Sequence, residues 1–284
     1  MHALVFAAGR GSRLRPYTDE MPKPLLEVGD EPILGRCLRT VAAAGVDEIV
    51  VVVGYRREEV VDAMGESVDG VSITYAVQRD RKGLAHAICK AAEDGFGISL
   101  PTDDRSATLS SESSSQPSNS LHPFEAFPDD VMTVNGDNVF DDCDLSKLRA
   151  RHDESGVDGT LLLDRVSRND AEATAHLDLA DDGTVRSVAA SIDDSGAPPM
   201  GSEPADASDE RYIAAGVQTH HGPSLLEACH RVDRAESGEY ELADALEFLV
   251  DEKRYVGVEL AGWHRNVNTP ADLETARRRL DGST

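Results

Sequence analysis

The segment from residue 8 to residue 32, AGRGSRLRPYTDEMPKPLLEVGDEP, combines glycines with cationic side chains directly after a short apolar stretch, His2–Ala8. Gly9 and Gly11 allow the backbone to approach a ligand closely and to direct N–H groups at a phosphate. A glycine-rich turn after a parallel strand is also where anionic ligands bind in open α/β sheets. The cations that could neutralise a triphosphate here are Arg10, Arg13, Arg15 and Lys23. The segment therefore predicts a polyphosphate site.

Two better-known glycine patterns do not fit this segment. The dinucleotide fingerprint G-x-G-x-x-G would require glycine where the chain has Leu14, and the phosphate loop G-x-x-x-x-G-K-[ST] does not occur in the sequence. Taken alone, Gly9 and Gly11 are equally compatible with a strand–helix turn whose arginines are merely solvated.

A longer pattern makes the prediction more specific. It reads G-x-G-x-R-L-x-P-x-T-x-x-x-P-K-P-L-L-x-V-x-x-x-P-I-L and extends from Gly9 to Leu34. This pattern resembles the signature of the sugar-1-phosphate nucleotidyltransferases, the family of glucose-1-phosphate thymidylyl- and uridylyltransferases. The resemblance covers residues 1–93 and 130–280.

Further segments resemble elements of the same family. The segment 78–85, QRDRKGLA, is similar to the element whose glutamine and glycine read the nucleobase. The segment 134–138, VNGDN, is similar to the element whose aspartate, Asp137 here, ligates Mg²⁺. The segment 238–244, GEYELAD, resembles the family's helix start G-E-x-E-x-T-D. The nucleotide-binding residues that the resemblance implies are Ala8, Gly9, Gly11, Ser12, Arg13, Gln78 and Gly83.

The segment 263–270, WHRNVNTP, resembles the family's W-x-D-V-G-T-P, where a second metal ligand lies. Its aspartate is Asn266 here and its glycine is Asn268. Relatives that act on N-acetylglucosamine 1-phosphate use an asparagine at the position matching Asn268. Because an amide oxygen can ligate Mg²⁺ without adding charge, the resemblance implies a Mg²⁺ site with Asp137 and either Asn266 or Asn268. Two oxygen ligands on strand-end loops suit Mg²⁺, which also keeps waters and binds phosphates.

The acceptor half of the site departs from the family pattern. The family's E-K-P is reduced to Glu203-Pro204, no lysine occurs between residues 191 and 211, and a frequent glycine is replaced by Leu163. The residues that the resemblance implies for the sugar phosphate are Lys23, Asn138, Glu203, Gly216 and Glu241. The identity of the sugar is left open by these departures.

The expected chemistry follows from the charges of the substrates. A sugar 1-phosphate is already an anionic nucleophile, so attack on the α-phosphorus of an NTP requires no general base. Catalysis then consists of positioning and charge neutralisation. We expect Arg13 and Mg²⁺ to hold the β- and γ-phosphates, Lys23 to bridge the α-phosphate and the sugar phosphate, and Asp137 to hold the metal.

The predicted reaction transfers NMP from an NTP, with UTP or dTTP favoured, to a sugar 1-phosphate, with glucose 1-phosphate favoured, and releases pyrophosphate. Two alternatives stay open: a non-sugar phosphate acceptor, and a catalytically weak regulatory subunit that only binds nucleotides. The presence of Arg13, Lys23 and Asp137 argues against the second alternative.

The elements that must position these residues indicate an α/β protein. Continuous Val/Ile segments alternate with amphipathic ones, which is typical of a mostly parallel sheet covered on both faces, a three-layer, doubly wound, Rossmann-like arrangement. The predicted strands are His2–Ala8, Glu48–Val53, Val71–Val77, Asp130–Val134, Gly159–Val166, Thr174–Leu179, Thr184–Ala190, Tyr212–His220 and Arg254–Leu260. The predicted helices are Ile33–Ala44, Arg57–Met64, Leu84–Glu93, Leu145–His152, Ser224–Arg231, Leu242–Val250 and a last one with Thr269 as N-cap, Pro270 at the first position and Asp272 in a capping box.

A Ser-rich stretch interrupts this alternation. Residues 97–128 include SATLSSESSSQPSNS, which is too polar to offset its ordering entropy, and we interpret it as a mobile insertion within one domain spanning 1–284. The chain ends soon after the last helix, so we expect no C-terminal β-helix domain of the kind some relatives carry.

The charge balance excludes several other functions. Twenty-eight Lys+Arg against 53 Asp+Glu give a net charge of −25, which disfavours nucleic acids and anionic membranes as partners. With few lysines and acidic residues throughout, the composition favours a halophilic protein. An ordinary acidic enzyme is the alternative. The start of the sequence has no basic region and no stretch reaches about 18 apolar residues, so we expect a soluble, cytoplasmic protein and leave a homo-oligomer open. The four cysteines lie far apart, so neither zinc spacing nor a disulfide framework is indicated.

Overall fold

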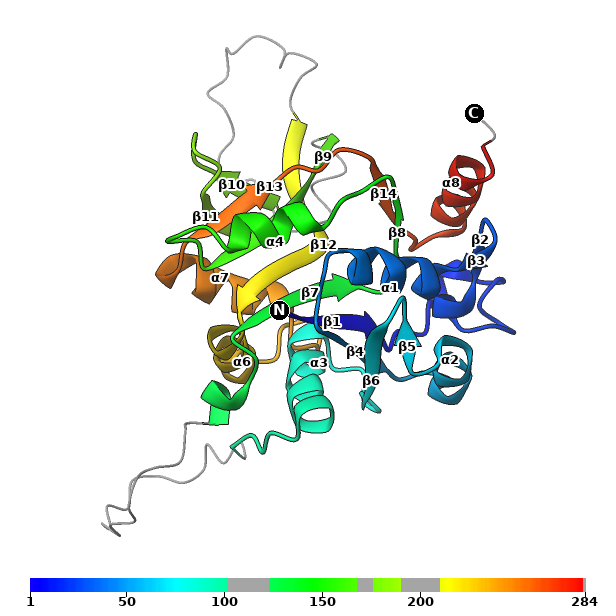
Figure 1. The fold of residues 1–284 in the computed structure, drawn as a ribbon, viewed down its shortest axis with the longest axis horizontal. Coiled ribbons are helices and arrows are strands. Elements are labelled where there is room, and N and C mark those ends of the chain that lie inside the picture. The colour runs from blue at the N-terminus through cyan, green and yellow to red at the C-terminus, as the bar shows by residue number, and fades with distance from the viewer. Residues whose placement is uncertain (102–122, 168–175, 190–209, 283–284) are drawn as a thin grey trace.

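The computed structural model describes residues 1–101, 123–167, 176–189 and 210–282 (Figure 1). At its centre lie four parallel neighbours in the order β7 (Asp130–Asn135), β1 (His2–Ala7), β4 (Glu48–Val53) and β6 (Val71–Val77). β4, EIVVVV, is a continuous run of Ile and Val after its first residue, as expected of a parallel strand that is buried on both faces. The predicted α/β class with a parallel central sheet is confirmed.

The sheet continues beyond β7 with antiparallel pairs. β12 (Glu210–His221) pairs with β7, β9 (Gly159–Ser167) and β10 (His176–Leu179), and β10 pairs with β11 (Val185–Ala189). β13 (Tyr255–Val258) runs parallel to β9, and the short β5 (Ser67–Val68) edges the opposite side. The long strand β12 thus joins the parallel centre to the outer strands.

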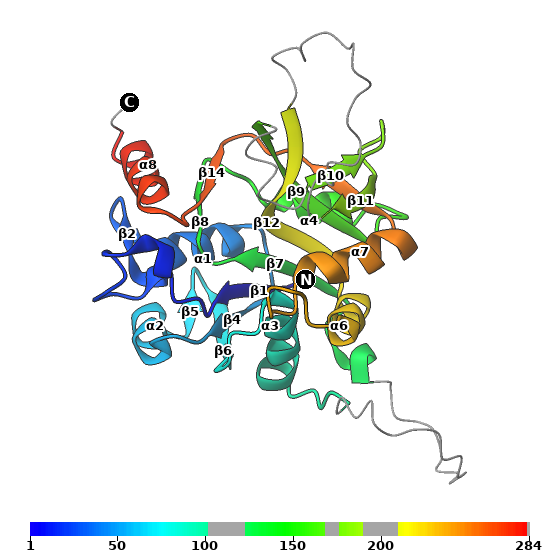
Figure 2. The same cartoon turned by 180° about the vertical axis from the view of Figure 1, so that it is seen from behind.

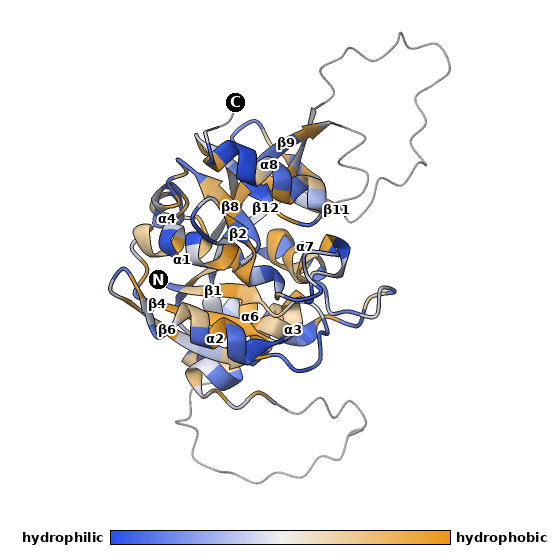
Figure 3. Ribbon diagram, turned by 90° about the vertical axis from the view of Figure 1, so that its right-hand side faces the viewer, coloured by the Kyte–Doolittle hydropathy of each residue, from blue (hydrophilic) through white to orange (hydrophobic). Residues whose placement is uncertain are grey.

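Helices cover the sheet on both faces, which gives three layers (Figures 1 and 2). One face carries α1 (Ile33–Ala43), α2 (Arg57–Met64) and α4 (Ser146–His152), and the other carries α3 (Leu84–Lys90), α6 (Gly222–Arg231) and α7 (Leu242–Glu252). Alternate residues of β4 enter the two cores, since Ile49 and Val51 pack with the first group and Val50 with the second. Figure 3 shows the resulting apolar interior between more polar outer helix faces.

A third, smaller core holds the functional segments together. It contains Leu14 of the glycine-rich segment, Val139 of β8 (Asn138–Asp141) and Val267, with Leu273 of α8 (Pro270–Leu280). β8 pairs with β14 (Trp263–Asn266), and β2 (Glu27–Val28) pairs with β3 (Glu31–Pro32). The capping box predicted at the start of α8 is present: the Thr269 hydroxyl accepts a hydrogen bond from the backbone N–H of Asp272, and the Asp272 carboxylate accepts one from the backbone N–H of Thr269.

The predicted helices and strands are confirmed within one to three residues at most ends, including the hairpin β10–β11. One difference is that the helix predicted for 84–93 changes at Lys90 into a π-helical turn, Ala91–Gly95. The Ser-rich centre of the predicted insertion lies outside the described residues, and the part before β7 contains a 3₁₀ turn, Pro123–Ala126. Within the described ranges, no helix has the length and apolar character that crossing a bilayer requires.

Candidate active site

The glycine-rich segment follows the carboxyl end of β1 and forms a tight loop. Gly11 has a positive φ of 67°, and a side chain there would place its Cβ 2.7 Å from Cβ of Lys23. The Thr18 hydroxyl donates to the Gly11 carbonyl at 2.9 Å, and Leu14 is fully buried beneath the loop. The loop thus packs directly against Lys23, which explains why glycine is required at position 11.

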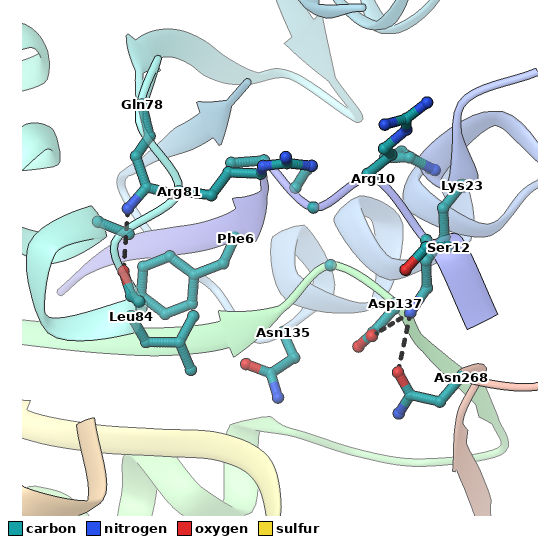
Figure 4. Close-up of a pocket in the computed structure, with 18 of the residues that line it drawn as sticks. Phe6, Arg10, Ser12, Lys23, Gln78, Arg81, Leu84, Asn135, Asp137 and Asn268 are labelled. Atoms are coloured by element: carbon teal, nitrogen blue, oxygen red, sulfur yellow. Dashed lines mark hydrogen bonds and ion pairs between the residues drawn. The ribbon is translucent and has the colours of Figure 1, made fainter. Parts of the chain in front are cut away.

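Lys23 is the centre of a polar cluster. Its Nζ donates to Oδ2 of Asp137 at 2.5 Å and to Oδ1 of Asn268 at 3.1 Å, and Nη2 of Arg13 donates to the same Asn268 oxygen at 3.1 Å (Figure 4). Lys23 is only 9% exposed. Four residues from three distant parts of the chain therefore meet at one point.

The backbone around Asp137 fixes this meeting point. Gly136 follows β7, its N–H donates to the carbonyl of Phe6 at 2.9 Å, and a Cβ there would lie 2.8 Å from that same oxygen. The N–H of Val267 donates to the Asp137 carbonyl at 3.0 Å. Below the loop, burial and then the nearby Asp137 carboxylate raise the pKa of the Cys37 thiol, so this cysteine stays neutral.

The segment predicted to read the nucleobase lies across the site from the polar cluster around Lys23 (Figure 4). Nε2 of Gln78 donates to the Gly83 carbonyl at 2.9 Å and lies 2.9 Å from Nδ1 of His86. Burial, with Lys82 and Lys90 adding to it, lowers the pKa of His86, which favours its neutral form. The amide nitrogen of Gln78 is therefore occupied, and its oxygen accepts no hydrogen bond from any described residue.

A second loop clamps this segment. The Tyr240 N–H donates to the Lys82 carbonyl at 2.6 Å, and the Ala85 N–H donates to the Tyr240 carbonyl at 3.1 Å. Gly83 has a φ of 96°, and a Cβ there would lie 2.3 Å from the Tyr240 oxygen. The segments 78–85 and 238–244, singled out separately in the sequence, thus hold each other.

Two adjoining cavities open at this end of the sheet. The first, about 620 Å³, is lined by Ala8, Gly9, Gly11, Ser12, Arg13, Lys23, Gln78, Gly83, Asp137 and Asn268 together with Phe6, Arg10, Arg81, Asn135 and others. The second, about 360 Å³, is lined by Gly216, Glu241, Thr133, Gln218 and others, and it shares Phe6, Gly83, Leu84, Asn135 and Glu239 with the first. All residues predicted to bind nucleotide therefore line one cavity.

Several predicted residues lie elsewhere. Asn138 is fully buried, lines neither cavity and donates from Nδ2 to the carbonyls of Ala215 and Gly216 at 3.3 Å. The side chain thus holds the backbone of β12, and its predicted contact with the sugar phosphate stays a prediction. Asn266 also lines neither cavity, whereas Asn268 contacts Lys23. Glu203 lies outside the described residues.

The cations of the first cavity differ from the expected set at two residues. Arg15 lines neither cavity and instead pairs with Asp19 at 3.3 Å on the surface. Arg81, which sequence reasoning did not single out, lines the first cavity (Figure 4). The sequence contains a signal for this role, because the segment 78–85, QRDRKGLA, carries three cationic residues around Asp80.

The oxygen atoms near Lys23 fit a magnesium ion. Oδ1 of Asp137 is buried and has no hydrogen-bond partner among the described residues, and Oδ1 of Asn268 lies on the same cluster. No group of three or more His, Cys, Asp or Glu side chains suited to a metal occurs in the described part of the chain. A carboxylate and an amide oxygen beside a phosphate cavity match the sparse protein ligation that Mg²⁺ uses.

Fold and site together define an α/β protein with a cavity that carries a glycine-rich loop and several cations, next to a second cavity. The model of a family described as "Nucleotidyl transferase" matches residues 2–95. The whole chain is 30% identical to the UTP–glucose-1-phosphate uridylyltransferase AglF of Haloferax volcanii, over 100% of this chain and 98% of that one. It is 27% identical to a glucose-1-phosphate thymidylyltransferase of Streptomyces griseus, over 99% of this chain and 69% of that one.

The chain belongs to the sugar-1-phosphate nucleotidyltransferase family, as its motifs predicted. A solved structure titled as UDP-glucose pyrophosphorylase complexed with UDP-glucose shares the fold, with a TM-score of 0.71 over 100% of this chain and 99% of that chain, at 16% identity.

Proposed function

We propose that this protein is a Mg²⁺-dependent uridylyltransferase that joins UTP and glucose 1-phosphate into UDP-glucose with release of pyrophosphate. The observation that carries the proposal is Lys23, whose buried ammonium lies between Asp137 and Asn268 at the floor of the first cavity. The full-length similarity to AglF, which is named for this activity, supports the choice of substrates.

The geometry of Gln78 supports a uracil or thymine base. With Nε2 occupied by Gly83 and His86, the side chain offers an acceptor oxygen to the base. Uracil and thymine carry an N–H donor between their carbonyls, whereas cytosine and adenine carry an acceptor at the corresponding edge. An acceptor held at this position therefore favours UTP or dTTP over CTP or ATP.

The residues of the chain act by charge and position. Arg13 and the backbone N–H groups of the loop at Gly9 and Gly11 bind the phosphates, and Arg10 and Arg81 add positive charge at the cavity wall. Lys23 holds the α-phosphate and the sugar phosphate against each other, which offsets their mutual repulsion. No residue needs to remove a proton, because the attacking phosphate oxygen is already ionised.

Mg²⁺ would be held by Asp137 together with Asn266 or Asn268 and, when bound, would supply further neutralisation of the phosphate charge. Binding of a divalent cation at Asp137 requires the Lys23 ammonium to share this carboxylate or to leave it. We expect Lys23 to turn toward the phosphates when both substrates are present.

The test is pyrophosphate release by the purified protein at high KCl with Mg²⁺, across UTP, dTTP, GTP, CTP and ATP, each with several sugar 1-phosphates. The proposal expects turnover with UTP and glucose 1-phosphate that is lost without a divalent cation. A preference for a non-sugar phosphate acceptor, or nucleotide binding without turnover for any pair, would refute it.

A further inference from the structure

The second cavity contains a buried polar side chain with an unsatisfied atom. Gln218 is 7% exposed, lines this cavity, and its Oε1 has no hydrogen-bond partner among the described residues. A buried acceptor without a partner is unfavourable, so such a group usually indicates a missing ligand or water. The last torsion of a glutamine is soft, and its amide can present either its oxygen or its nitrogen to a ligand.

The backbone of β12 is shaped to aim this residue. The register between β12 and β9 shifts between Ala214 and Gln218, and Gly216 in this irregular stretch has a φ of 76°. A Cβ at Gly216 would lie 2.7 Å from Nδ2 of Asn135, which lines both cavities. Gln218 follows this irregular stretch and lies beside Thr133 of β7, its partner in the regular β12–β7 register.

Thr133 is already engaged, in contrast to Gln218. Its hydroxyl lies 3.2 Å from Nε2 of His220, whose Nδ1 lies 2.9 Å from the hydroxyl of Tyr255. Thr133 thus belongs to a buried network behind the cavity. The amide of Gln218 is the uncommitted polar group of the pair.

The charges around the second cavity restrict its ligand further. Among its described lining residues are two carboxylates, Glu239 and Glu241, and no lysine or arginine. Glu239 is exposed and Glu241 is half-buried, and at contact distance, well inside the screening length, both would repel an anionic ring substituent. The remaining walls include the apolar side chains of Val188, Leu242 and Leu246, which suit the carbon faces of a sugar ring.

We propose that Gln218 determines acceptor specificity: it hydrogen-bonds a ring hydroxyl of the acceptor, and its cavity takes hexose 1-phosphates with an uncharged ring and rejects uronic acid 1-phosphates. This inference rests on the proposed function, because it places the acceptor in the second cavity. Gln218 contacts the substrate away from the reacting phosphates, so its removal raises KM for the sugar phosphate more than it lowers kcat.

The test compares Gln218→Leu, which keeps the volume and removes the polar atoms, with Thr219→Val as a matched control. Thr219 is the next residue on β12, is fully buried, and bonds Thr160 and His152 instead of lining either cavity. Kinetics are measured with glucose 1-phosphate, its four monodeoxy analogues and glucuronic acid 1-phosphate. Affinities for UDP-glucose and for UDP are measured by calorimetry.

We expect one deoxy analogue to lose at least about tenfold in kcat/KM with the parent protein, and this loss to disappear in Gln218→Leu but persist in Thr219→Val. The parent protein should turn over the uronic acid at least about a hundredfold less efficiently than glucose 1-phosphate. An unchanged deoxy pattern in Gln218→Leu, or equal use of the uronic acid, would overturn the inference while leaving the uridylyltransferase activity established.

Calorimetry covers the case in which no turnover is found. If UDP-glucose binds the parent protein more tightly than UDP does, and Gln218→Leu removes this difference without weakening UDP, the specificity role holds although the proposed activity fails. If UDP-glucose binds no more tightly than UDP to the parent protein, the inference is overturned.

Discussion

The Lys23 ammonium lies 2.5 Å from the Asp137 carboxylate, although 114 positions separate the two residues in the chain. β1 and β7 are parallel neighbours, so the loops that follow them emerge side by side, and this adjacency brings the pair together. The two side chains are 11% and 24% exposed, which keeps the pair from being a freely solvated surface contact. The cation needed for the reaction is thus held in place by the fold itself.

Replacing Lys23 by alanine should abolish turnover and leave the fold intact. Loss of a positioned cation that stabilises transition-state charge typically costs two to three orders of magnitude, and we expect a fall in kcat/KM of about 10³. Lys147→Ala, at an exposed position on α4, is the control and should retain parental kinetics. Pyrophosphate release and circular dichroism check both variants, and near-normal kcat in Lys23→Ala would disprove its catalytic role.

Gly83→Ala should both destabilise the protein and weaken nucleotide binding. Gly83 has a φ of 96°, which disfavours alanine, and the added Cβ would also collide with the Tyr240 carbonyl. Gly70→Ala separates the two effects, because Gly70 has a φ of 84° but nothing within 4 Å of its added Cβ. We expect about 1 kcal/mol of destabilisation for Gly70→Ala and at least about twice that for Gly83→Ala in urea titrations. Equal losses in the two variants would mean that the contact with Tyr240 carries no energy.

Asp272→Ala should loosen the wall of the first cavity at Asn268, just before α8. The Asp272 carboxylate accepts hydrogen bonds from the backbone N–H groups of Asn268 and Thr269, at 3.2 and 2.9 Å. Its loss should cost about 1 kcal/mol, or about 2–4 °C in Tm, and raise KM for UTP because Asn268 is less firmly placed. Thr275→Ala, later in the same helix, should leave KM unchanged. If Asp272→Ala lowers Tm but keeps the parental KM for UTP, the helix cap does not position Asn268 for UTP binding.

Stability should fall as the pH drops because of His220. Burial, and then the neighbouring His152, lowers the pKa of His220 to about 3. The pKa of His220 in the folded protein lies below its ordinary value of 6.5, so the unfolded chain binds the proton more readily. The contribution of neutral His220 to the free energy of unfolding is therefore fully present above pH 6.5 and is lost as the pH falls toward 3. His220→Gln should flatten the decline in unfolding free energy between pH 7.5 and 5.

The neighbouring His221 is the control for that measurement. It is exposed on the other side of β12 and bonds the Ser224 hydroxyl at 2.9 Å. His221→Gln should keep the parental pH dependence. If both substitutions change the slope equally, the buried position of His220 is not its cause.

Salt should act in opposite directions on stability and on substrate binding. A net charge of −25 makes the folded state self-repelling, so added KCl should raise Tm, whereas it should screen the cationic loop and raise KM for UTP. Thermal unfolding and initial rates across a KCl series check both. Full stability in dilute buffer would contradict a halophilic origin of the charge.

Much of the architecture could be predicted because the strands that form its centre carry the signal locally. The strand Glu48–Val53 is predicted to the residue because its run of Ile and Val reads as a buried strand, and Val71–Val77 is predicted to the residue because β-branched and aromatic side chains recur in it. Most residues predicted to bind nucleotide lie in one contiguous segment, from Ala8 to Arg13, and they line one cavity together with Gln78 and Gly83. Their role in binding nucleotide stays a prediction.

The acceptor side could not be predicted in the same way. β8 and β14 are four residues each and are mostly polar, so they have no periodicity and exist through pairing across more than 120 positions. Gln218 lies on β12 between Thr133 of β7 and Leu161 of β9, so its neighbours come from three strands that are far apart in the sequence. Asn138 follows the predicted metal ligand Asp137 in the VNGDN segment, but its side chain is buried and donates to backbone carbonyls of β12, which no local pattern reveals.

Five residues, Phe6, Gly83, Leu84, Asn135 and Glu239, line both cavities, so no partition divides the space for the nucleotide from the space for the acceptor. A molecule that fills both cavities is a bivalent ligand, whose second half binds at a high effective concentration once the first is seated. The nucleotide sugar formed here has this character. We therefore expect strong product inhibition, and a non-reactive bisubstrate analogue with its two halves covalently joined should bind far more tightly than either half.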